Sequence, residues 1–446
     1  MERIRKLIAQ PDQPAAYEPL DDSVEDDVAE REHTRQRPWA RFSRLEYGVF
    51  FLLGVAMLWA WNMFLAAAPY FHERFESNEW AATHYQSSIL SVSTVTNLAS
   101  AYTLARVQKN VSYPWRITLS LLLNCLVFTL LAFSTVVFKD ISVQGYFGFL
   151  MVMVLGASFA TGLNQNGVFA YVSGFGREEY TQAIMGGQGV AGVLPCVVQI
   201  LSVLTVPRQK GPQGSSPESA FIYFLTATGV SVLTLLAFLY LLRHRPCPLP
   251  KTTDEDEEAT LVSQGHNKSV SLWTLFKKLR HLASAVFVCF LITMMVFPVF
   301  TTEIQSVNDP EKSRMYDSPV FIPLSFLFWN AGDLAGRMAV ANPKLSLAHR
   351  PWMTFALSIA RVAFIPLYLL CNVNGRGAVV SSDFFYLVVV QLFFGATNGY
   401  LASSCMMGAS QWVSANEREA AGGFMSMMLV GGLAAGSLSS FLVASS

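Results

Sequence analysis

The chain has 446 residues, of which 52% are hydrophobic, 13% aromatic and only 14% charged. Average soluble proteins carry about 25% charged residues, so this composition excludes a soluble globular protein, and its apolar content excludes a disordered one. The 31 lysines and arginines are balanced by 31 acidic residues, which leaves no basic excess of the kind that nucleic-acid-binding proteins use.

Charged residues are confined to short segments that separate long stretches with few or no charges. Each stretch can hold a helix of about 20 residues, the length needed to cross about 30 Å of hydrocarbon. We therefore predict an all-α integral membrane protein with eleven transmembrane helices. In chain order the stretches are Tyr47 to Phe71, Tyr85 to Ala105, Ile117 to Phe138, Ile141 to Gly176, Tyr180 to Pro207, Ser219 to Leu242, Leu282 to Thr302, Ser318 to Val340, Pro351 to Cys371, Phe384 to Val413 and Ala420 to Ser446.

The segments outside these stretches predict the orientation and the domains. The tail, residues 1–45, has charges of both signs and no apolar core, so we expect it in the cytosol and not as a signal peptide. Segments on the same side as the tail hold most of the lysines and arginines, as cytoplasmic loops do, and an odd number of helices then places the C-terminus outside or in a lumen. We expect a six-helix bundle over 46–243, a cytosolic linker over 244–280 and a five-helix bundle over 281–446.

The linker contains the acidic run Asp254-Glu-Asp-Glu-Glu, which is typical of a solvated and disordered segment. Its role is left open. Two bundles with a path between them are the architecture of many secondary transporters.

Amide side chains lie at membrane depth in several predicted helices. Asn97 is in the second, and the run Asn164-Gln165-Asn166 is in the fourth. Successive side chains on a helix are about 100° apart, so at most two of the three amides in the run can face one cavity. An amide donates and accepts hydrogen bonds, which suits an uncharged heterocycle such as a nucleobase. Hydrogen bonding between helices is the alternative for each amide.

The eighth predicted helix carries a polar stripe. Its four members are spaced i, i+4, i+7 and i+11, which places them on one helix face, with an acidic and a basic group one turn apart. They are Phe326, Asn330, Asp333 and Arg337. The charged pair can bind the hydroxyls of a sugar, lock two helices together or act as a gating latch, and the sequence leaves these three interpretations open.

Glycines and one proline indicate where helices approach or bend. Gly187 and Gly189 belong to a cluster in the fifth predicted helix, which predicts close helix packing. The cluster lacks the Lys-Ser/Thr of a phosphate-binding loop, so it does not indicate a nucleotide site. Phe297-Pro298 removes a backbone donor and predicts a kink beside the cavity. No Walker motif, metal-ligand cluster or nucleophile triad is present in the sequence, so we expect neither an enzyme nor a cofactor.

With these motifs the sequence resembles the equilibrative nucleoside transporter family, and in particular an intracellular or vacuolar, fungal-like member. The resemblance runs in order from about Phe50 to Leu442. The segments that carry it are Trp61-Asn62, Asn164 through Gly192, Phe297-Pro298, Asn330 through Arg337 and Asn398-Gly-Tyr-Leu401.

The resemblance implies a six-plus-five bundle of major-facilitator type that moves nucleosides, and nucleobases as a further candidate, by facilitative alternating access. It implies that Trp61 lines the cavity, that Gln165 bonds to the base, and that Asp333 with Arg337 engages the ribose. The set that it assigns to the substrate is Trp61, Leu65, Gln165, Phe326, Asn330, Asp333, Arg337 and Leu433. Asn97, a polar residue at membrane depth, is a further candidate for the substrate site. The glycine and proline patterns make Phe297, Pro298, Gly187 and Gly189 the candidates for gating or structure.

Other functions stay open. The first is a proton-coupled nucleoside or nucleobase carrier, and the second is a sugar or drug carrier of major-facilitator type, which would need twelve helices. A receptor or structural membrane protein is the alternative without transport. The expected partners are a nucleoside and the lipid bilayer, with no nucleic acid, and the chain is expected to be a monomer. Tyr17-Glu-Pro-Leu20 fits a sorting signal that an adaptor would bind, which predicts a vacuolar or endolysosomal membrane; otherwise the plasma membrane is expected.

Overall fold

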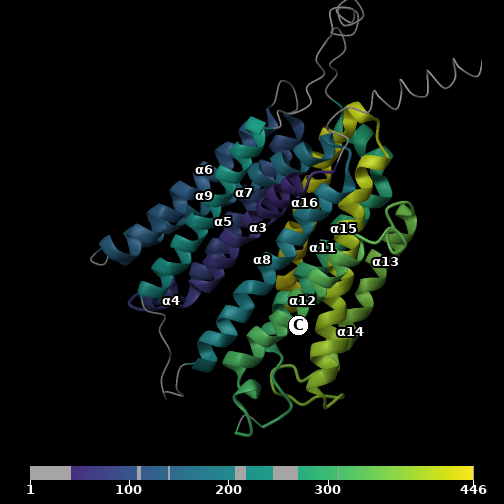
Figure 1. The fold of residues 1–446 in the computed structure, drawn as a ribbon. Helices are drawn as coiled ribbons and strands as arrows, with labels where there is room; N and C mark the ends of the chain where they lie inside the picture. The colour runs from purple at the N-terminus through teal and green to yellow at the C-terminus, as the bar shows by residue number, and fades with distance from the viewer. Residues whose placement is uncertain are drawn as a thin grey trace, which may run out of the picture. The chain divides into compact units, whose positions relative to one another are not determined.

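The computed structural model describes residues 42–107, 112–138, 141–205, 217–244, 270–309 and 311–444. Within these ranges every regular secondary-structure element is a helix (Figure 1). The one β contact among them is an isolated bridge between Ile304 and Val373. The predicted sorting signal Tyr17–Leu20 and the acidic run 254–258 lie outside the described residues.

The first half of the chain supplies seven helices, and the first two of them together form one membrane span, Arg44–Phe75. Three of these helices begin at a capping side chain: Asn78, Ser112 and Ser142 each accept a hydrogen bond from the backbone amide three residues on. The elements are α3 (Arg44–Ala66), α4 (Ala68–Phe75), α5 (Glu79–Arg106), α6 (Tyr113–Val137), α7 (Val143–Gly174), α8 (Glu178–Thr205) and α9 (Pro217–His244).

The second half is less regular. Its ninth predicted span is divided into α13, η4 and α14, and its tenth begins with a π-helical segment, a form common near functional sites. The elements are α11 (Leu272–Glu303), η3 (Arg314–Tyr316), α12 (Ser318–Ala339), α13 (Pro351–Ala360), η4 (Arg361–Ala363), α14 (Phe364–Leu369), η5 (Phe385–Leu392), α15 (Phe393–Gly408), η6 (Ala409–Gln411), η7 (Ala415–Glu417) and α16 (Arg418–Ala444).

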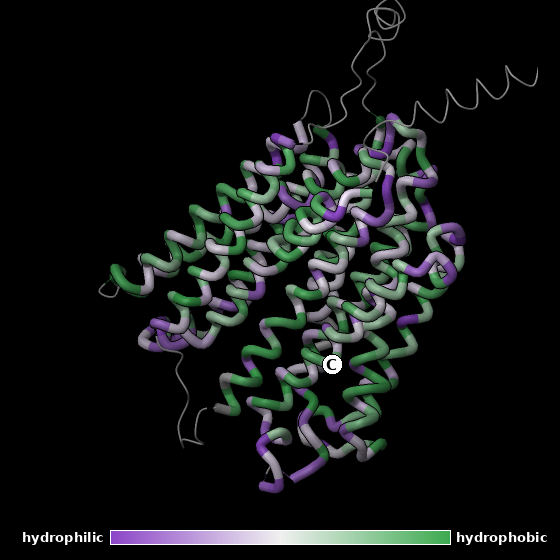
Figure 2. Tube along the Cα trace, viewed as in Figure 1, coloured by the Kyte–Doolittle hydropathy of each residue, from purple (hydrophilic) through white to green (hydrophobic). Residues whose placement is uncertain are grey.

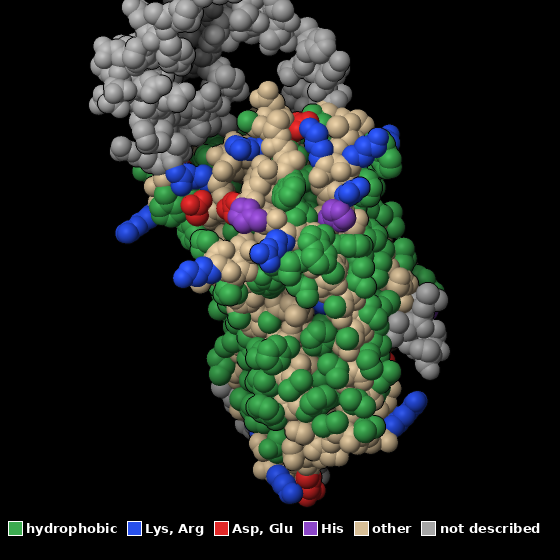
Figure 3. All heavy atoms as spheres, turned by 90° about the vertical axis from the view of Figure 1, so that its right-hand side faces the viewer, with side chains coloured by type: hydrophobic (Ala, Val, Ile, Leu, Met, Phe, Trp, Pro, Cys, Tyr) green, Lys and Arg blue, Asp and Glu red, His purple; other side chains and the backbone are tan. Residues whose placement is uncertain are grey.

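Nine spans among the described residues are long and apolar enough to cross a membrane. The long helices α5 and α12, which carry several of the polar residues discussed above, are not among the nine, so the total of eleven stays a prediction. Hydrophilic segments gather at the helix ends (Figure 2), and hydrophobic side chains cover the middle of the face seen in Figure 3. Such an apolar surface belongs in lipid.

The boundary of the predicted linker differs from the structure. The helix α11 begins at Leu272, inside the range 244–280, because Ser271 caps it and because Leu275 and Leu279 are buried in the core. The charged residues Lys277, Lys278 and Arg280 are exposed next to these buried leucines, so charge alone does not mark the start of α11, and the domain bounds stay a prediction. Helix α11 also continues through Pro298 to Glu303.

The hydrophobic core has three clusters, and only one of them is shared by the two halves. The shared cluster draws on the end of α7 and the start of α8 from the first half, and on the start of α16 from the second. We call this the Gly174 end of the protein. At the opposite end, which we call the Arg314 end, one cluster contains only residues of the first half and another only residues of the second. Among the described residues, the halves therefore share a hydrophobic core at the Gly174 end alone.

Candidate functional site

The polar stripe of α12 forms a buried ion pair. The Nε of Arg337 lies 2.6 Å from Oδ2 of Asp333, and each side chain is 5% exposed. The two residues are one helical turn apart, so the helix itself brings them together. Burial of both charges requires that their other polar atoms are bonded as well.

Those further bonds tie the pair to two other helices. The guanidinium of Arg337 donates to the carbonyl of Met185 at 3.2 Å and to Oε1 of Gln188 at 2.9 Å, both in α8. The other carboxylate oxygen of Asp333 accepts from Nδ2 of Asn398 in α15 at 2.7 Å. The pair therefore joins the first half to the second.

Glycines permit this close approach. A Cβ at Gly332 or Gly336 would collide with the backbone of α15, and one at Gly189 would collide with Leu334 of α12. Gly187 lies in the same way against the backbone of α3. Gly192 leaves room for the amide of Asn330. The small residues thus set the spacing at which the polar side chains of α8, α12 and α15 meet.

The other end of the stripe is aromatic. The ring of Phe326 lies edge-on to Phe297 at 5.1 Å, and Phe297 stacks on Trp329 at 4.1 Å. Nδ2 of Asn330 donates to the carbonyl of Phe326 at 2.9 Å and lies 3.6 Å from the sulfur of Cys196. Pro298 follows Phe297 and is half-buried. In this structure Asn330 contacts α8 and not Asp333.

The amides of the first half separate into two groups. Asn166 accepts from Arg116 at 2.6 Å, so it serves the packing of α6 on α7. Among the described residues, Oε1 of Gln165, Oδ1 of Asn97 and both amide atoms of Asn164 are buried without a hydrogen-bond partner. Buried amides normally have partners, so these atoms keep a hydrogen-bonding capacity that no described residue uses.

The remaining predicted residues are accessible to different degrees. Leu65 is 57% exposed, whereas Trp61 and Leu433 are half-buried. The neighbour of Trp61, Asn62, donates to the carbonyl of Ala191 at 2.7 Å, which places this part of α3 against α8. The structure thus brings α3, α8 and α12 together, while Asn97 and Gln165 lie on the packed helices α5 and α7.

Two residues that the site depends on were not assigned a role by sequence reasoning. Gln188 and Asn398 hold the ion pair, yet each is a single amide in an apolar stretch. The signals for them are weak: Gln188 interrupts the glycine cluster, and Asn398 precedes a glycine that lets α15 approach α12.

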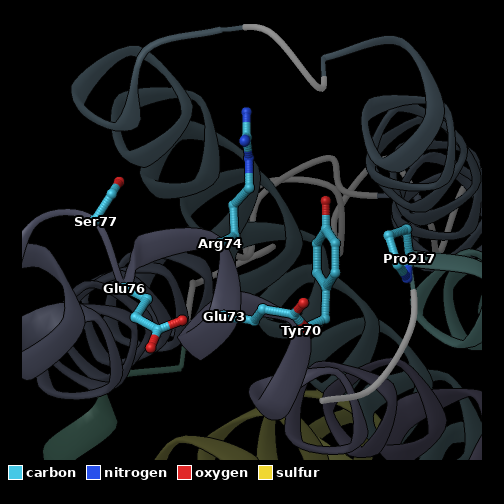
Figure 4. Close-up of a pocket in the computed structure, with 6 residues that line it drawn as sticks. All are labelled: Tyr70, Glu73, Arg74, Glu76, Ser77 and Pro217. Atoms are coloured by element: carbon cyan, nitrogen blue, oxygen red, sulfur yellow. The ribbon is translucent and has the colours of Figure 1, made fainter.

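A cavity of about 510 Å³ lies elsewhere, at the Arg314 end. It is lined by Tyr70, Glu73, Arg74, Glu76, Ser77 and Pro217, shown in Figure 4. None of the predicted site residues line it. The guanidinium of Arg74 donates to the carbonyls of Phe138 and Ile141, so it holds the end of α6 near the start of α7.

Known proteins resemble this chain in sequence and in fold. The profile of a family described as nucleoside transporter matches residues 150–445. The chain is 31% identical to the nucleoside transporter FUN26 of Saccharomyces cerevisiae, over 90% of this chain and 84% of that protein, and 29% identical to the human equilibrative nucleoside transporter 1, over 92% and 98%. The structure is similar to that of FucP, a major facilitator superfamily transporter, with a TM-score of 0.51 and 14% identity over 91% of each chain, which is a likeness of fold.

Proposed function

The chain belongs to the nucleoside transporter family, and from that premise we propose that it carries nucleosides across a membrane by facilitative alternating access. It is a multi-pass membrane protein of major-facilitator type and not an enzyme. The arrangement of the core carries the mechanistic part of the proposal. Because the halves share a core only at the Gly174 end, the described state is closed at that end.

The closed end is assigned to the cytosol. The described helix ends there carry Arg106, Arg243, Lys278 and Arg350, in keeping with the preference of lysine and arginine for cytoplasmic loops. On this assignment the C-terminus lies outside or in a lumen. At the Arg314 end the halves share no cluster of the described core, and Arg314 joins them through the carbonyls of Val203 and Leu204 in α8. The predicted bundles over 46–243 and 281–446 are then the two bodies that move against each other.

Substrate recognition is assigned to two polar groups on different helices. We assign the unpaired amide atoms of Gln165 and Asn97 to a nucleobase, with Trp61 for stacking, because buried amides normally have partners and these atoms have none among the described residues. The pair Asp333–Arg337 is assigned to the ribose hydroxyls, because carboxylates accept and guanidiniums donate to them. Trp61, Leu65, Phe326, Asn330 and Leu433 are proposed to line the path.

A second role of the ion pair has its own support. The bonds from Arg337 to Met185 and Gln188 cross between the halves, so they must break when the Gly174 end opens. The pair therefore also acts as a latch of the closed state. We propose that binding of the ribose competes with these bonds and so couples substrate to opening.

Uptake by the purified protein in proteoliposomes tests the function. Radiolabelled uridine and adenosine should enter vesicles that contain the protein faster than protein-free vesicles, with and without a pH gradient. Uptake only with a gradient would assign a proton-coupled carrier instead. Entry of a labelled hexose but of neither nucleoside would contradict the proposal.

The subcellular location is proposed from the N-terminal tail, residues 1–45. Tyr17-Glu-Pro-Leu20 would bind a sorting adaptor and direct the chain, as a monomer, to a vacuolar or endolysosomal membrane. There it would release salvaged nucleosides to the cytosol.

A further inference from the structure

A second arginine is buried at membrane depth in the second half. Arg361 begins η4, lies inside the span Pro351–Leu369 and is 2% exposed. No carboxylate of the described residues forms an ion pair with it. A cation at this depth is costly, so its retention indicates a function.

All three nitrogens of Arg361 are bonded. Nε donates to Oγ1 of Thr397 at 3.1 Å, and one terminal nitrogen donates to the carbonyl of Cys289 at 2.7 Å and to Oγ1 of Thr293 at 2.8 Å. The other terminal nitrogen donates to the carbonyl of Phe394 at 3.2 Å, and the guanidinium lies 4.3 Å from the centre of that ring. The charge is therefore held rigidly by α11 and α15.

The hydrogen bond from Arg361 to Thr293 is the first of a series of hydrogen bonds that ends at Asp333. The hydroxyl of Thr293 accepts from Arg361, and its oxygen lies 2.8 Å from two acceptors for its single hydrogen, Oδ1 of Asn398 and the carbonyl of Cys289 in its own helix. The amide nitrogen of Asn398 then donates to Oδ1 of Asp333 at 2.7 Å. A guanidinium has donors only, so when the Thr293 hydroxyl donates to Asn398, every hydrogen bond of this series points from Arg361 toward the carboxylate.

This series of hydrogen bonds differs from Arg337, the other partner of Asp333, because none of its members bonds to the described residues of the first half of the protein. Thr293, Asn398 and Arg361 all belong to the second half, so their bonds can persist when the halves move. The bond from Arg337 to Asp333 lies within α12 and can persist as well, but the other bonds of that guanidinium run to α8, and those must break. A carboxylate at membrane depth needs a support that persists through this change.

We infer that Arg361 is a positioning residue that acts through Thr293 and Asn398 to hold Asp333 in its binding geometry in both states of the transport cycle. The inference rests on the proposed function, because it takes Asp333 as the group that binds the ribose. Arg361 does not touch the substrate.

The test compares uptake of uridine with uptake of 2′,3′-dideoxyuridine, which lacks the 2′ and 3′ hydroxyls of the ribose and keeps the 5′ hydroxyl. Thr293→Val removes the hydroxyl link but keeps both arginines, and Thr293→Ser keeps the link. The matched control is Thr301→Val, two turns along the same helix, whose hydroxyl is also buried and accepts from Gln391 at 2.9 Å, in a network that does not lead to Asp333.

Thr293→Val should lower the ratio of uridine to dideoxyuridine uptake by about fivefold, the factor that one buried hydrogen bond corresponds to. Thr293→Ser should restore the ratio, and Thr301→Val should leave it at the wild-type value even if total uptake falls. Arg361→Gln should lower the ratio at least as far as Thr293→Val, and Arg361→Lys should recover part of it. If Arg361→Gln does not fold, Thr293→Val still decides, since it preserves the buried charge.

An equal loss of both nucleosides in Thr293→Val would overturn the inference, because damage to packing does not distinguish the hydroxyls. The same ratio change in Thr301→Val would also overturn it. Absence of uptake by the wild type contradicts the proposed function instead, so the two failures are distinguishable.

Discussion

Removing Arg337 should be more harmful than removing both members of its ion pair. In Arg337→Ala, Oδ2 of Asp333 loses its partner while the carboxylate stays buried, and the carbonyl of Met185 and the amide of Gln188 lose a donor. Breaking one side of a buried pair costs about 3–5 kcal/mol, most of it from the uncompensated charge. Asp333→Asn/Arg337→Ala removes that charge, so it should be no less stable than Arg337→Ala.

The assay is thermal unfolding of the purified variants in detergent together with uridine uptake. Each single variant, Asp333→Asn and Arg337→Ala, should abolish transport, because the ribose contact and the latch both need the pair. Lys278→Ala is the control: it breaks the pair with Glu417 at 2.6 Å, whose lysine is 41% exposed, and such pairs contribute about 0–1 kcal/mol. A double variant whose loss of stability equals the sum of the two single losses would refute the reasoning.

Three further predictions concern the base, the helix packing and the address. Gln165→Ala and Trp61→Ala should each weaken nucleoside binding without preventing folding, by about 1 kcal/mol for an amide bond and about 1–3 kcal/mol for stacking, and normal uptake kinetics in both would contradict their assignment. Gly187→Val should destabilise the protein by about 1–3 kcal/mol because its side chain meets the backbone of α3, whereas Gly48→Ala, with open space around it, should not lower the melting temperature. Tyr17→Ala in a fluorescent fusion should move the protein from a vacuolar or endolysosomal membrane to the plasma membrane, and an unchanged location would remove the sorting proposal but not the transport proposal.

The sequence predicted most of the helices and the polar stripe of α12 for local reasons. Charges cannot remain in hydrocarbon without partners, so their confinement marks the spans. The pairing of Asp333 with Arg337 follows from helical periodicity, because residues four apart always share a face. The start of α11 was less predictable, since its first turns carry charges on one side and buried leucines on the other.

The partners of the stripe could not be derived in this way. Gln188 bonds to a residue 149 positions away, and Asn398 to one 65 positions away. No spacing rule links such distant positions, and a single amide has no signature that separates a partner of an ion pair from a packing residue. Arg361 was visible as a charge within a span, but its bonds to α11 and α15 appear only in the fold.

The sequence by itself determined that this is a helical membrane protein of the nucleoside transporter family, because hydropathy and local motifs are properties of contiguous residues. The tertiary structure alone decided which end is closed, which amides keep unpaired atoms and which helices hold Asp333. Each of these depends on how segments far apart in the sequence pack, and close approaches at glycines permit that packing, such as Gly189 against Leu334 between the halves and Gly332 against the backbone of α15 within the second half.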